Sequence, residues 1–436
     1  MVYRGVQMEK LLVHGQRPLQ GEVPIGGAKN AALGIIAAAL LADDVVILEN
    51  IPDIADTKNL VTILKQMQVR VEYLDRHTLR IDSRGMQNVC VDSEEVRKMR
   101  ASYYLLGALL GRFRRARVAF PGGCDFGSRP IDQHIKGFEA LGATVDAKAI
   151  IEIDAPKLKG NNIFFDMVSV GATINVMLAA VLAEGTTVIE NAAKEPHVVD
   201  TASFLNSMGA DIKGAGTDVI RIKGVARLKG SRYTIIPDQI EAGTYMIAAA
   251  VTRGDVTVRN IIPRHMDSIS AKLREAGVTV QEDEDSIRVI GSEKMNPVKI
   301  KTLPYPGFPT DMQPQMMVLL SLIDGTSIIN ESVYDSRFRY VEQLRHLGAD
   351  IEVEGHIAVV NGVPKLIASE VKATDLRAGA AMILAGLAAE GVTGISNVAL
   401  IDRGYEHIVE KLNNMGAWIE RIDISPDFDL KQEKLG

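Results

Sequence analysis

The chain has 436 residues, of which 47% are hydrophobic and 24% are charged, with two cysteines and one tryptophan. This length exceeds one ordinary hydrophobic core, so we expect two domains of roughly 200 residues each. The net charge of −6 argues against a protein that gains its affinity by neutralising a nucleic-acid backbone. Two cysteines in so long a chain exclude a disulfide framework and are typical of a reducing compartment, so we expect a cytoplasmic protein.

No segment has the pattern of a membrane span. Residues 1–10 lack the apolar run of a secretory signal. The most apolar stretches, 31–42 and 174–183, are shorter than the roughly 18 residues that cross a bilayer. We therefore expect a protein that does not interact with a membrane.

After a first strand within residues 10–25, a repeated segment follows along the chain. It reads L-x-x-h-G-A-x-h, where h is apolar, and it ends an amphipathic helix before a strand. The glycine suits a left-handed cap at the end of the helix. The six copies have their turn residue at Gln68, Gly142, Gly209, Gly277, Gly348 and Gly416. The intervals are 67–74 residues, which indicates six copies of one folding unit.

Each unit also contains an apolar, alanine-rich helix, a turn and a β-branched strand. A helix that is hydrophobic nearly all round is buried, so each unit should enclose this helix beneath a sheet and the amphipathic helix. The helices are expected to begin near Lys29, Arg100, Gly171, Glu241, Asp311 and Arg377. The strands behind them are expected to end around Asn50, Phe120, Asn191, Asn260, Asn330 and Asn397. Six units favour three per domain, with a break near 234–237.

The start of a buried helix suits an anion, because its first N–H groups lack partners and its dipole is positive there. Lys29 stands at the first such start, behind Gly26 and Gly27, where a cation is unfavourable unless an anion lies nearby. The alternative is a solvated lysine with Asn30 as the N-cap. Arg100 and Arg377 occupy the equivalent positions in the second and sixth units. Arginine is suited to bidentate binding of carboxylate or phosphate.

The segment 121–130 is glycine-rich where other units have an ordinary turn, and we expect a mobile lid. It contains Cys124, and Arg129 lies close enough in sequence to favour a thiolate. The alternative is an inert core cysteine, the kind that Cys90 resembles in the apolar strand run 89–91.

Asp311 lies in the first turn of the fifth buried helix, where it is either an N-cap or a general base. Arg337 and Arg403 follow later in the chain. No His or Cys cluster has metal-ligand spacing, and the G-x-x-x-x-G-K-[ST], G-x-S-x-G and G-x-G-x-x-G motifs are missing.

From about Leu11 to Ile422 the chain resembles the UDP-N-acetylglucosamine enolpyruvyl transferases of the EPSP synthase superfamily. The segments that carry the resemblance are 26–30, 99–102, 121–124, 129–132, 168–173, 308–313, 375–378 and 401–405. It implies an α/β fold of two similar inside-out domains, each of three repeated units with buried helices, around a cleft. It also implies that residues 27–236 form the first domain, with the Cys124 loop, and that residues 1–26 plus 237–436 form the second.

The resemblance further implies transfer of the enolpyruvyl group of phosphoenolpyruvate to the 3′-hydroxyl of UDP-N-acetylglucosamine, with release of phosphate and without a metal or organic cofactor. This reaction is the first committed step of peptidoglycan synthesis. By the same resemblance Cys124 is the general acid, Asp311 takes the proton of the sugar hydroxyl, and Lys29 is catalytic. Phosphoenolpyruvate would contact Lys29, Asn30, Arg129, Arg377 and Arg403. The UDP-sugar would contact Arg100, Arg129, Pro130, Ile131, Asp132, Gln133, Val170, Gly171, Asp311 and the backbone of Val333.

Two departures from the family pattern concern nucleotide affinity. Met167 stands where some members have Lys, and Gln239 stands where Arg is frequent. Two alternatives remain, an enolpyruvylshikimate phosphate synthase and a non-catalytic paralogue that binds UDP-sugar. The first of these families is expected to have Gly-Ser-Lys-Ser where this chain has Gly27-Ala28-Lys29-Asn30, and to lack the Cys124 loop. An RNA-end cyclase is disfavoured by the negative charge.

Overall fold

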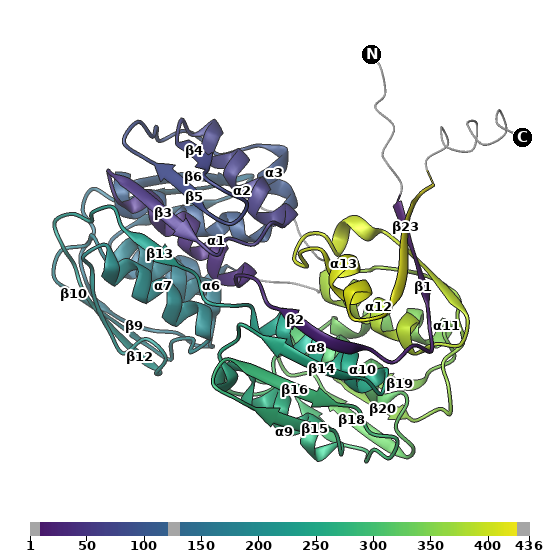
Figure 1. Cartoon of the computed structure of the whole chain (residues 1–436). Helices are drawn as coiled ribbons and strands as arrows, with labels where there is room; N and C mark the ends of the chain where they lie inside the picture. The colour runs from purple at the N-terminus through teal and green to yellow at the C-terminus, as the bar shows by residue number, and fades with distance from the viewer. Residues whose placement is uncertain (1–8, 121–130, 425–436) are drawn as a thin grey trace, which may run out of the picture. The chain divides into compact units, whose positions relative to one another are not determined.

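The computed structural model describes residues 9–120 and 131–424 (Figure 1). The chain divides into two compact units, a central unit of Gly26–Pro237 and a terminal unit of Met1–Ile25 with Asp238–Gly436. The chain therefore passes from one unit to the other twice, at Ile25–Gly26 and at Pro237–Asp238.

The described part of the central unit contains three sheets, with strand orders β13-β3-β5-β4, β6-β8-β7 and β11-β12-β10-β9. Its elements are α1 (Lys29–Ala38), β3 (Val45–Glu49), α2 (Ala55–Gln66), β4 (Arg70–Tyr73), β5 (Leu79–Asp82), α3 (Glu94–Lys98), α4 (Tyr104–Phe113), β6 (Arg115–Ala119), α5 (Asp132–Ala140), β7 (Thr144–Ala147), β8 (Ile150–Asp154), β9 (Asn162–Phe164), α6 (Val170–Ala180), β10 (Thr186–Glu190), α7 (Pro196–Ser207), β11 (Asp211–Lys213), β12 (Val219–Lys223) and β13 (Arg232–Thr234).

The described part of the terminal unit also contains three sheets, ordered β15-β16-β14-β2, β17-β18-β20-β19 and β21-β22-β1-β23. Its elements are β1 (Glu9–His14), β2 (Gln20–Pro24), α8 (Gln239–Val251), β14 (Asp255–Arg259), α9 (Asp267–Glu275), β15 (Thr279–Glu282), β16 (Ser286–Ile290), β17 (Lys299–Lys301), α10 (Gln313–Leu320), β18 (Thr326–Asn330), α11 (Val341–His346), β19 (Asp350–Glu354), β20 (Ile357–Asn361), β21 (Glu370–Lys372), α12 (Leu376–Ala388), β22 (Val392–Ser396), α13 (Ile408–Asn414) and β23 (Trp418–Asp423). The first strand, β1, pairs antiparallel with both β22 and β23.

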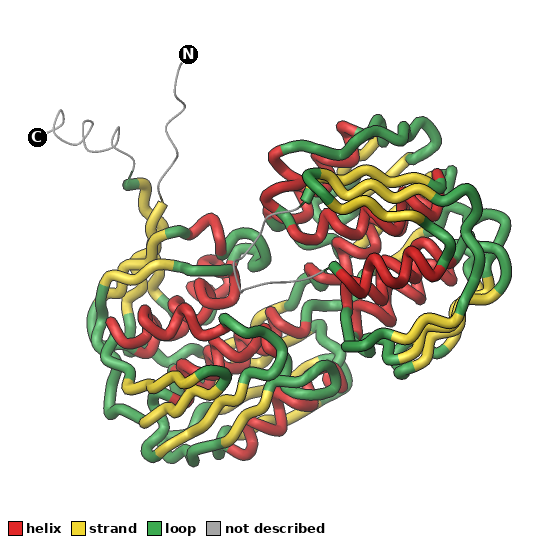
Figure 2. Tube along the Cα trace, turned by 180° about the vertical axis from the view of Figure 1, so that it is seen from behind, coloured by secondary structure: helices red, strands yellow, loops and turns green. Residues whose placement is uncertain are grey.

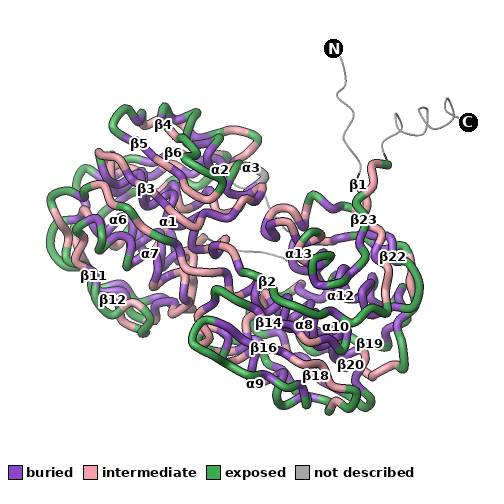
Figure 3. Tube along the Cα trace, viewed as in Figure 1, coloured by how far each residue is buried: buried purple, intermediate pink, exposed green. Residues whose placement is uncertain are grey.

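Within each unit the sheets cover the apolar helices, which lie in the interior, whereas amphipathic helices such as α9 lie at the surface (Figure 2). One apolar helix of each repeat is buried almost completely. All residues of α12 and all but the first residue of α8 are buried, as the purple traces of these helices show (Figure 3). The prediction that the alanine-rich helices form the interior is therefore confirmed.

The predicted starts of the buried helices are confirmed to within two residues for α1, α6, α8 and α12. In the second and fifth repeats a 3₁₀ turn comes first, at Arg100–Tyr103 and at Thr310–Met312, so α4 and α10 begin four and two residues later than predicted. Pro314 stands in the first turn of α10, where its missing N–H costs nothing.

The turn residue of every repeated segment has a left-handed backbone, as predicted. The φ angles are 63° at Gln68, 91° at Gly142, 103° at Gly209, 91° at Gly277, 89° at Gly348 and 94° at Gly416. Glycine adopts this conformation without steric cost, which explains its use at five of the six positions. Over the described residues, no helix is both long and apolar enough to cross a bilayer.

Candidate active site

Lys29 is the first residue of α1 and is largely buried rather than solvated. Its Nζ lies 3.1 Å from Oδ2 of Asp56, in the first turn of α2, and only 11% of the Lys29 side chain is exposed. The N-cap of α1 is Ala28, without a side-chain hydrogen bond, so the alternative that placed Asn30 at the cap is wrong. The expected nearby anion is supplied by Asp56, which no sequence pattern had identified.

A buried histidine links three helices of the central unit. The backbone N–H of Gly107 in α4 donates to Oδ1 of Asn175 (2.8 Å), so the amide of Asn175 is oriented with Nδ2 toward Nδ1 of His134 (3.0 Å). Because Nδ1 accepts this bond, the neutral ring carries its proton on Nε2. This Nε2 lies close to Gly171 at the start of α6, where an added Cβ would be 2.9 Å away. Gly171 therefore leaves room for the imidazole.

The same histidine stays neutral over the physiological pH range. Burial, and secondly the positive charge of Arg100, lower the pKa of His134 to about 4. Arg100 lies at the start of the 3₁₀ turn before α4, with its guanidinium 5.9 Å from the centre of the Tyr103 ring. The neutral His134 is thus an N–H donor that carries no charge of its own.

The Gln133 side chain, at the start of α5, forms hydrogen bonds with Asp132 and Asp166, an arrangement that we call the Gln133 clamp. Its amide donates to Asp132 (2.9 Å) and to Asp166 (3.2 Å), and its carbonyl accepts from the backbone N–H of Asp166 (2.9 Å). The side chain is therefore engaged with the protein itself. Ile131 is the N-cap residue of α5, and Val170 opens α6 after the capping residue Ser169. The N–H groups at the start of α6 suit a phosphate.

The Asp311 carboxylate of the terminal unit is held by two arginines. Nε of Arg377 lies 3.2 Å from Oδ2, and Nη2 of Arg337 lies 3.5 Å from Oδ1. The Arg377 and Arg337 side chains are 4% and 1% exposed, whereas Asp311 is 30% exposed. Asp311 caps neither its own turn nor α10, so the capping alternative is wrong. One face of an oriented carboxylate remains accessible.

Arg377 is itself fixed by a buried network. Asp375 caps α12 by accepting from the backbone N–H of Arg377 (2.9 Å), and the guanidinium lies 5.4 Å from the centre of the Tyr405 ring. The Tyr405 hydroxyl bonds with Thr244 (2.9 Å) and accepts from Gln315 (3.1 Å). Burial opposes the charge of Arg377, but Tyr405 and Asp311 raise its pKa above the usual value. Within the described residues, Nη1 of Arg377 is buried without a hydrogen-bond partner.

Two further predicted site residues, Arg403 and Val333, lie in the terminal unit. Arg403 is half-buried in the segment between Leu400 and α13. Val333 is 37% exposed, and its backbone N–H donates to Oε1 of Glu331 (2.9 Å). Because this N–H is already used, the carbonyl of Val333 is the backbone group that can accept a hydrogen bond from a ligand.

Three predicted residues, Cys124, Arg129 and Pro130, lie outside the described residues. Cys90 is half-buried in an irregular segment, and its neighbour Val91 forms only an isolated parallel bridge with Val118. The strand expected at 89–91 is therefore wrong.

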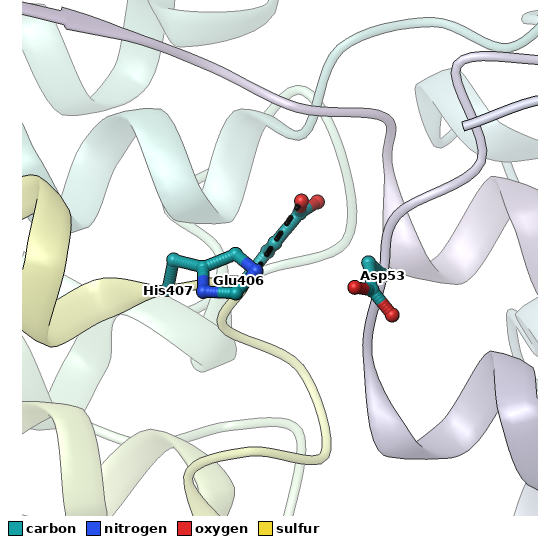
Figure 4. A group of neighbouring side chains, drawn as sticks. All are labelled: Asp53, Glu406 and His407. Atoms are coloured by element: carbon teal, nitrogen blue, oxygen red, sulfur yellow. Dashed lines mark ion pairs between the residues drawn. The ribbon is translucent and has the colours of Figure 1, made fainter. Parts of the chain in front are cut away.

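The three side chains drawn in Figure 4 come from different units. Glu406 and His407 belong to the terminal unit, where Nε2 of His407 lies 4.0 Å from Oε1 of Glu406, and Asp53 belongs to the central unit. Over residues 9–120 and 131–424, no three His, Cys, Asp or Glu side chains of a single unit gather as metal ligands would.

The two departures from the family pattern have different surroundings. Met167 is 57% exposed and follows Asp166, the partner of the Gln133 clamp. Gln239 is the first residue of α8, directly after the capping residue Asp238. Neither contacts the Asp311 carboxylate through a hydrogen bond or ion pair shown for the described residues.

Sequence reasoning missed Asp56, His134 and Glu331. Asp56 and Glu331 are buried acidic residues, and no local sequence pattern marks them as buried. His134 directly follows the predicted run 129–133, and this adjacency was the one signal available.

Comparisons with known proteins agree with this arrangement. The family model for EPSP synthase (3-phosphoshikimate 1-carboxyvinyltransferase) matches residues 13–412. UDP-N-acetylglucosamine 1-carboxyvinyltransferase 2 of Clostridium acetobutylicum is 58% identical over 416 residues, which are 95% of this chain and 99% of that protein. UDP-N-acetylglucosamine 1-carboxyvinyltransferase of Clostridium botulinum is 57% identical over 417 residues, 95% of this chain and 100% of that protein.

Solved structures show the same fold. The enolpyruvyl transferase NikO from Streptomyces tendae superposes with a TM-score of 0.87 at 26% identity, covering 96% of this chain and 100% of that one. EPSP synthase from Acinetobacter baumannii gives a TM-score of 0.74 at 18% identity, covering 95% and 100%, a likeness of fold alone. The chain belongs to the enolpyruvyl transferases, and within them to the UDP-N-acetylglucosamine 1-carboxyvinyltransferase family.

Proposed function

We propose that the protein transfers the enolpyruvyl group of phosphoenolpyruvate to the 3′-hydroxyl of UDP-N-acetylglucosamine and releases phosphate. The observation that carries the proposal is the Asp311 carboxylate oriented by Arg377 and Arg337. A general base has to present its oxygen within hydrogen-bond reach of the proton that it takes. The partly exposed Asp311 meets this need. The two Clostridium relatives are named as 1-carboxyvinyltransferases of UDP-N-acetylglucosamine, which supports the proposal.

The proposed chemistry balances with residues of this chain alone. The Cys124 thiol donates a proton to the methylene carbon of phosphoenolpyruvate, which leaves an oxocarbenium-like carbon. The sugar hydroxyl attacks that carbon while Asp311 takes the hydroxyl proton. The tetrahedral intermediate then returns a proton from its methyl group to the Cys124 thiolate and expels phosphate, which restores the carbon–carbon double bond and the thiol. The proton held by Asp311 leaves with the phosphate.

Cationic side chains support the anionic substrates in this proposal. Arg377 offers the buried Nη1 to an anion, and Arg403, Lys29, Asn30 and Arg129 complete the proposed phosphoenolpyruvate contacts. For UDP-N-acetylglucosamine we propose Arg100, the run 129–133, the first turn of α6 at Val170 and Gly171, Asp311 and the Val333 carbonyl. The engaged side chain of Gln133 limits that residue to backbone contacts.

The domain assignment and the cellular role are parts of the same proposal. We propose that the central and terminal units are the two three-repeat domains of the enzyme. The reaction would be the first committed step of peptidoglycan synthesis. It would take place in the cytoplasm, in agreement with the low cysteine content.

Phosphate release separates this function from its alternatives. The protein is incubated with phosphoenolpyruvate and either UDP-N-acetylglucosamine or shikimate 3-phosphate, and inorganic phosphate is measured. We expect release with the UDP-sugar alone. Release with shikimate 3-phosphate would identify an enolpyruvylshikimate phosphate synthase, and binding of the UDP-sugar without release would identify a non-catalytic paralogue.

A further inference from the structure

In four of the six repeats an asparagine side chain at the end of one strand forms a hydrogen bond to the neighbouring strand, a contact that we call the asparagine tie. In each, the residue after the strand that follows the buried helix is an asparagine with a left-handed backbone. Its amide donates to the carbonyl of the residue just beyond the parallel neighbouring strand. The pairs are Asn50 with Ile235 (2.9 Å), Asn191 with Phe165 (2.8 Å), Asn260 with Ile25 (2.7 Å) and Asn397 with Ala373 (3.2 Å).

The fifth repeat, which contains Asp311, replaces this asparagine by a glutamate. Glu331 follows β18 at the equivalent position, is fully buried, and has no left-handed backbone. The residue just beyond the neighbouring strand β17 is Thr302, and Oε1 of Glu331 accepts from its hydroxyl (2.8 Å). The position therefore still ties the two strands, but through a longer and charged side chain.

The extra length of the glutamate brings two further segments to the same carboxylate. Oε1 accepts from the backbone N–H groups of Val333 (2.9 Å) and Tyr334 (3.2 Å), and Oε2 accepts from the hydroxyl of Thr310 (2.9 Å). All four partners donate to the two carboxylate oxygens. Thr310 is the residue before Asp311, so one side chain fixes both the turn of the proposed base and the backbone at Val333.

We propose that Glu331 is a positioning residue that sets the distance between the Asp311 carboxylate and the Val333 carbonyl, and thereby orients the sugar acceptor. This inference rests on the proposed function, in which both groups contact UDP-N-acetylglucosamine. An asparagine at this position is one methylene shorter. It reaches Thr302 but not Thr310, so the tie used by the other repeats does not align these two segments.

Three variants separate positioning from a general loss of stability. Glu331→Gln keeps an acceptor for Thr302, Val333 and Tyr334, and its amide can donate to the Thr310 hydroxyl. Glu331→Asn installs the residue of the other repeats. Asn260→Ala, the matched control, removes the equivalent tie in the fourth repeat. Steady-state kinetics for each substrate, the Kd for UDP-N-acetylglucosamine and the thermal midpoint are measured for all three.

We expect Glu331→Asn to lose about tenfold or more in kcat/KM for the UDP-sugar, with the KM for phosphoenolpyruvate little changed. Glu331→Gln should stay within about threefold of the wild type, and Asn260→Ala should lower the thermal midpoint without this kinetic loss. Equal losses in Glu331→Gln and Glu331→Asn, or wild-type kinetics in Glu331→Asn, would overturn the proposal.

A fourth variant covers the case in which Glu331→Asn does not fold. Thr310→Val removes only the hydroxyl bonded to Oε2, and we expect about a threefold or larger fall in kcat with an unchanged KM for phosphoenolpyruvate. Unchanged kcat in Thr310→Val would then overturn the proposal. If the wild type binds the UDP-sugar without releasing phosphate, the proposed function fails, and the Kd values of the variants still decide the role of Glu331. A wild type that neither binds nor turns over the UDP-sugar would overturn both.

Discussion

The Nε atom of Arg377 lies 3.2 Å from Oδ2 of Asp311, although 66 positions of the chain separate the two residues. Each residue belongs to the start of a helical segment of the terminal unit, Asp311 in the turn before α10 and Arg377 in the first turn of α12. Because the arginine is buried and the carboxylate is partly exposed, the pair orients the carboxylate toward its open face. Two helix starts of the repeat architecture thereby orient the carboxylate that is proposed to take the hydroxyl proton.

We predict that Arg377→Met lowers kcat/KM for phosphoenolpyruvate by roughly ten- to a hundredfold, because a charge-assisted contact contributes about 1.5–3 kcal/mol. Arg259→Met is the matched control, since Arg259 forms an exposed ion pair with Glu22 in the same unit. Phosphate-release kinetics check both variants. Similar activity of Arg377→Met and Arg259→Met would contradict the proposed anion contact.

We predict a comparable loss of turnover for Lys29→Ala, because this variant removes a cation proposed to offset the charge of phosphoenolpyruvate. It should also lower the free energy of unfolding, since Asp56 is left buried without its lysine. Lys157→Ala, which breaks an exposed pair with Glu184 in the same unit, is the control for both measurements. Turnover in Lys29→Ala at the level of Lys157→Ala would refute the catalytic role.

Sequence patterns predicted the architecture better than the site. The spacing of Gly142, Gly209 and their equivalents identified the left-handed turns, because only a local backbone requirement is involved. Helix burial followed from apolar composition in the same way. The pairs Asp311–Arg377 and Lys29–Asp56 join different helices, and nothing in the local sequence indicates such partners. The repeated asparagine after the strands was visible in the sequence, but its hydrogen bond to the neighbouring strand was not.

The buried His134 predicts a loss of stability at acid pH. Its pKa is about 4 in the folded protein, against an ordinary value of 6.5 in an unfolded chain, so the unfolded chain binds more protons between these values. This contribution is fully present above pH 6.5 and is lost as the pH falls through about 4. We predict that His134→Gln reduces the loss of unfolding free energy over this pH window by up to about 3 kcal/mol. Urea unfolding across this window checks the slope, and an unchanged slope would contradict the neutral assignment.

Asp200 in α7 should affect the free energy of unfolding in the opposite direction, because its pKa is raised in the folded protein. Burial raises its pKa to about 6 from 3.8, against the lowering effect of the Tyr233 hydroxyl (2.6 Å) and the Ile236 N–H (3.3 Å). Its contribution is fully present below pH 3.8 and is lost as the pH rises through about 6. We predict that Asp200→Asn gains stability relative to the wild type over this window, by up to about 3 kcal/mol. The same unfolding series tests it, and a constant difference between the two proteins would refute the shifted pKa.

The last prediction concerns Cys124, whose proposed role is to protonate the methylene carbon of phosphoenolpyruvate. A thiol with a reference pKa of about 8.5 and a carboxyl of about 3.9 can both be shifted toward neutrality by a closed, charged site, whereas a serine hydroxyl is too weak an acid. Cys124→Asp should therefore keep substantial turnover, and Cys124→Ser should lose most of it while still binding the UDP-sugar.

Alkylation gives an independent readout of the same thiol. An epoxide-bearing phosphonate that mimics phosphoenolpyruvate should label the wild type and spare Cys124→Asp, because the carboxylate is the weaker nucleophile. Cys90, the other cysteine of the chain, is the internal control. Intact-mass spectrometry detects the adduct, and peptide mapping assigns it to one of the two thiols. If the adduct were on Cys90, or if Cys124→Ser turned over like the wild type, proton donation by Cys124 would have to be abandoned, since a thiol essential as the acid has to lie beside the bound phosphonate.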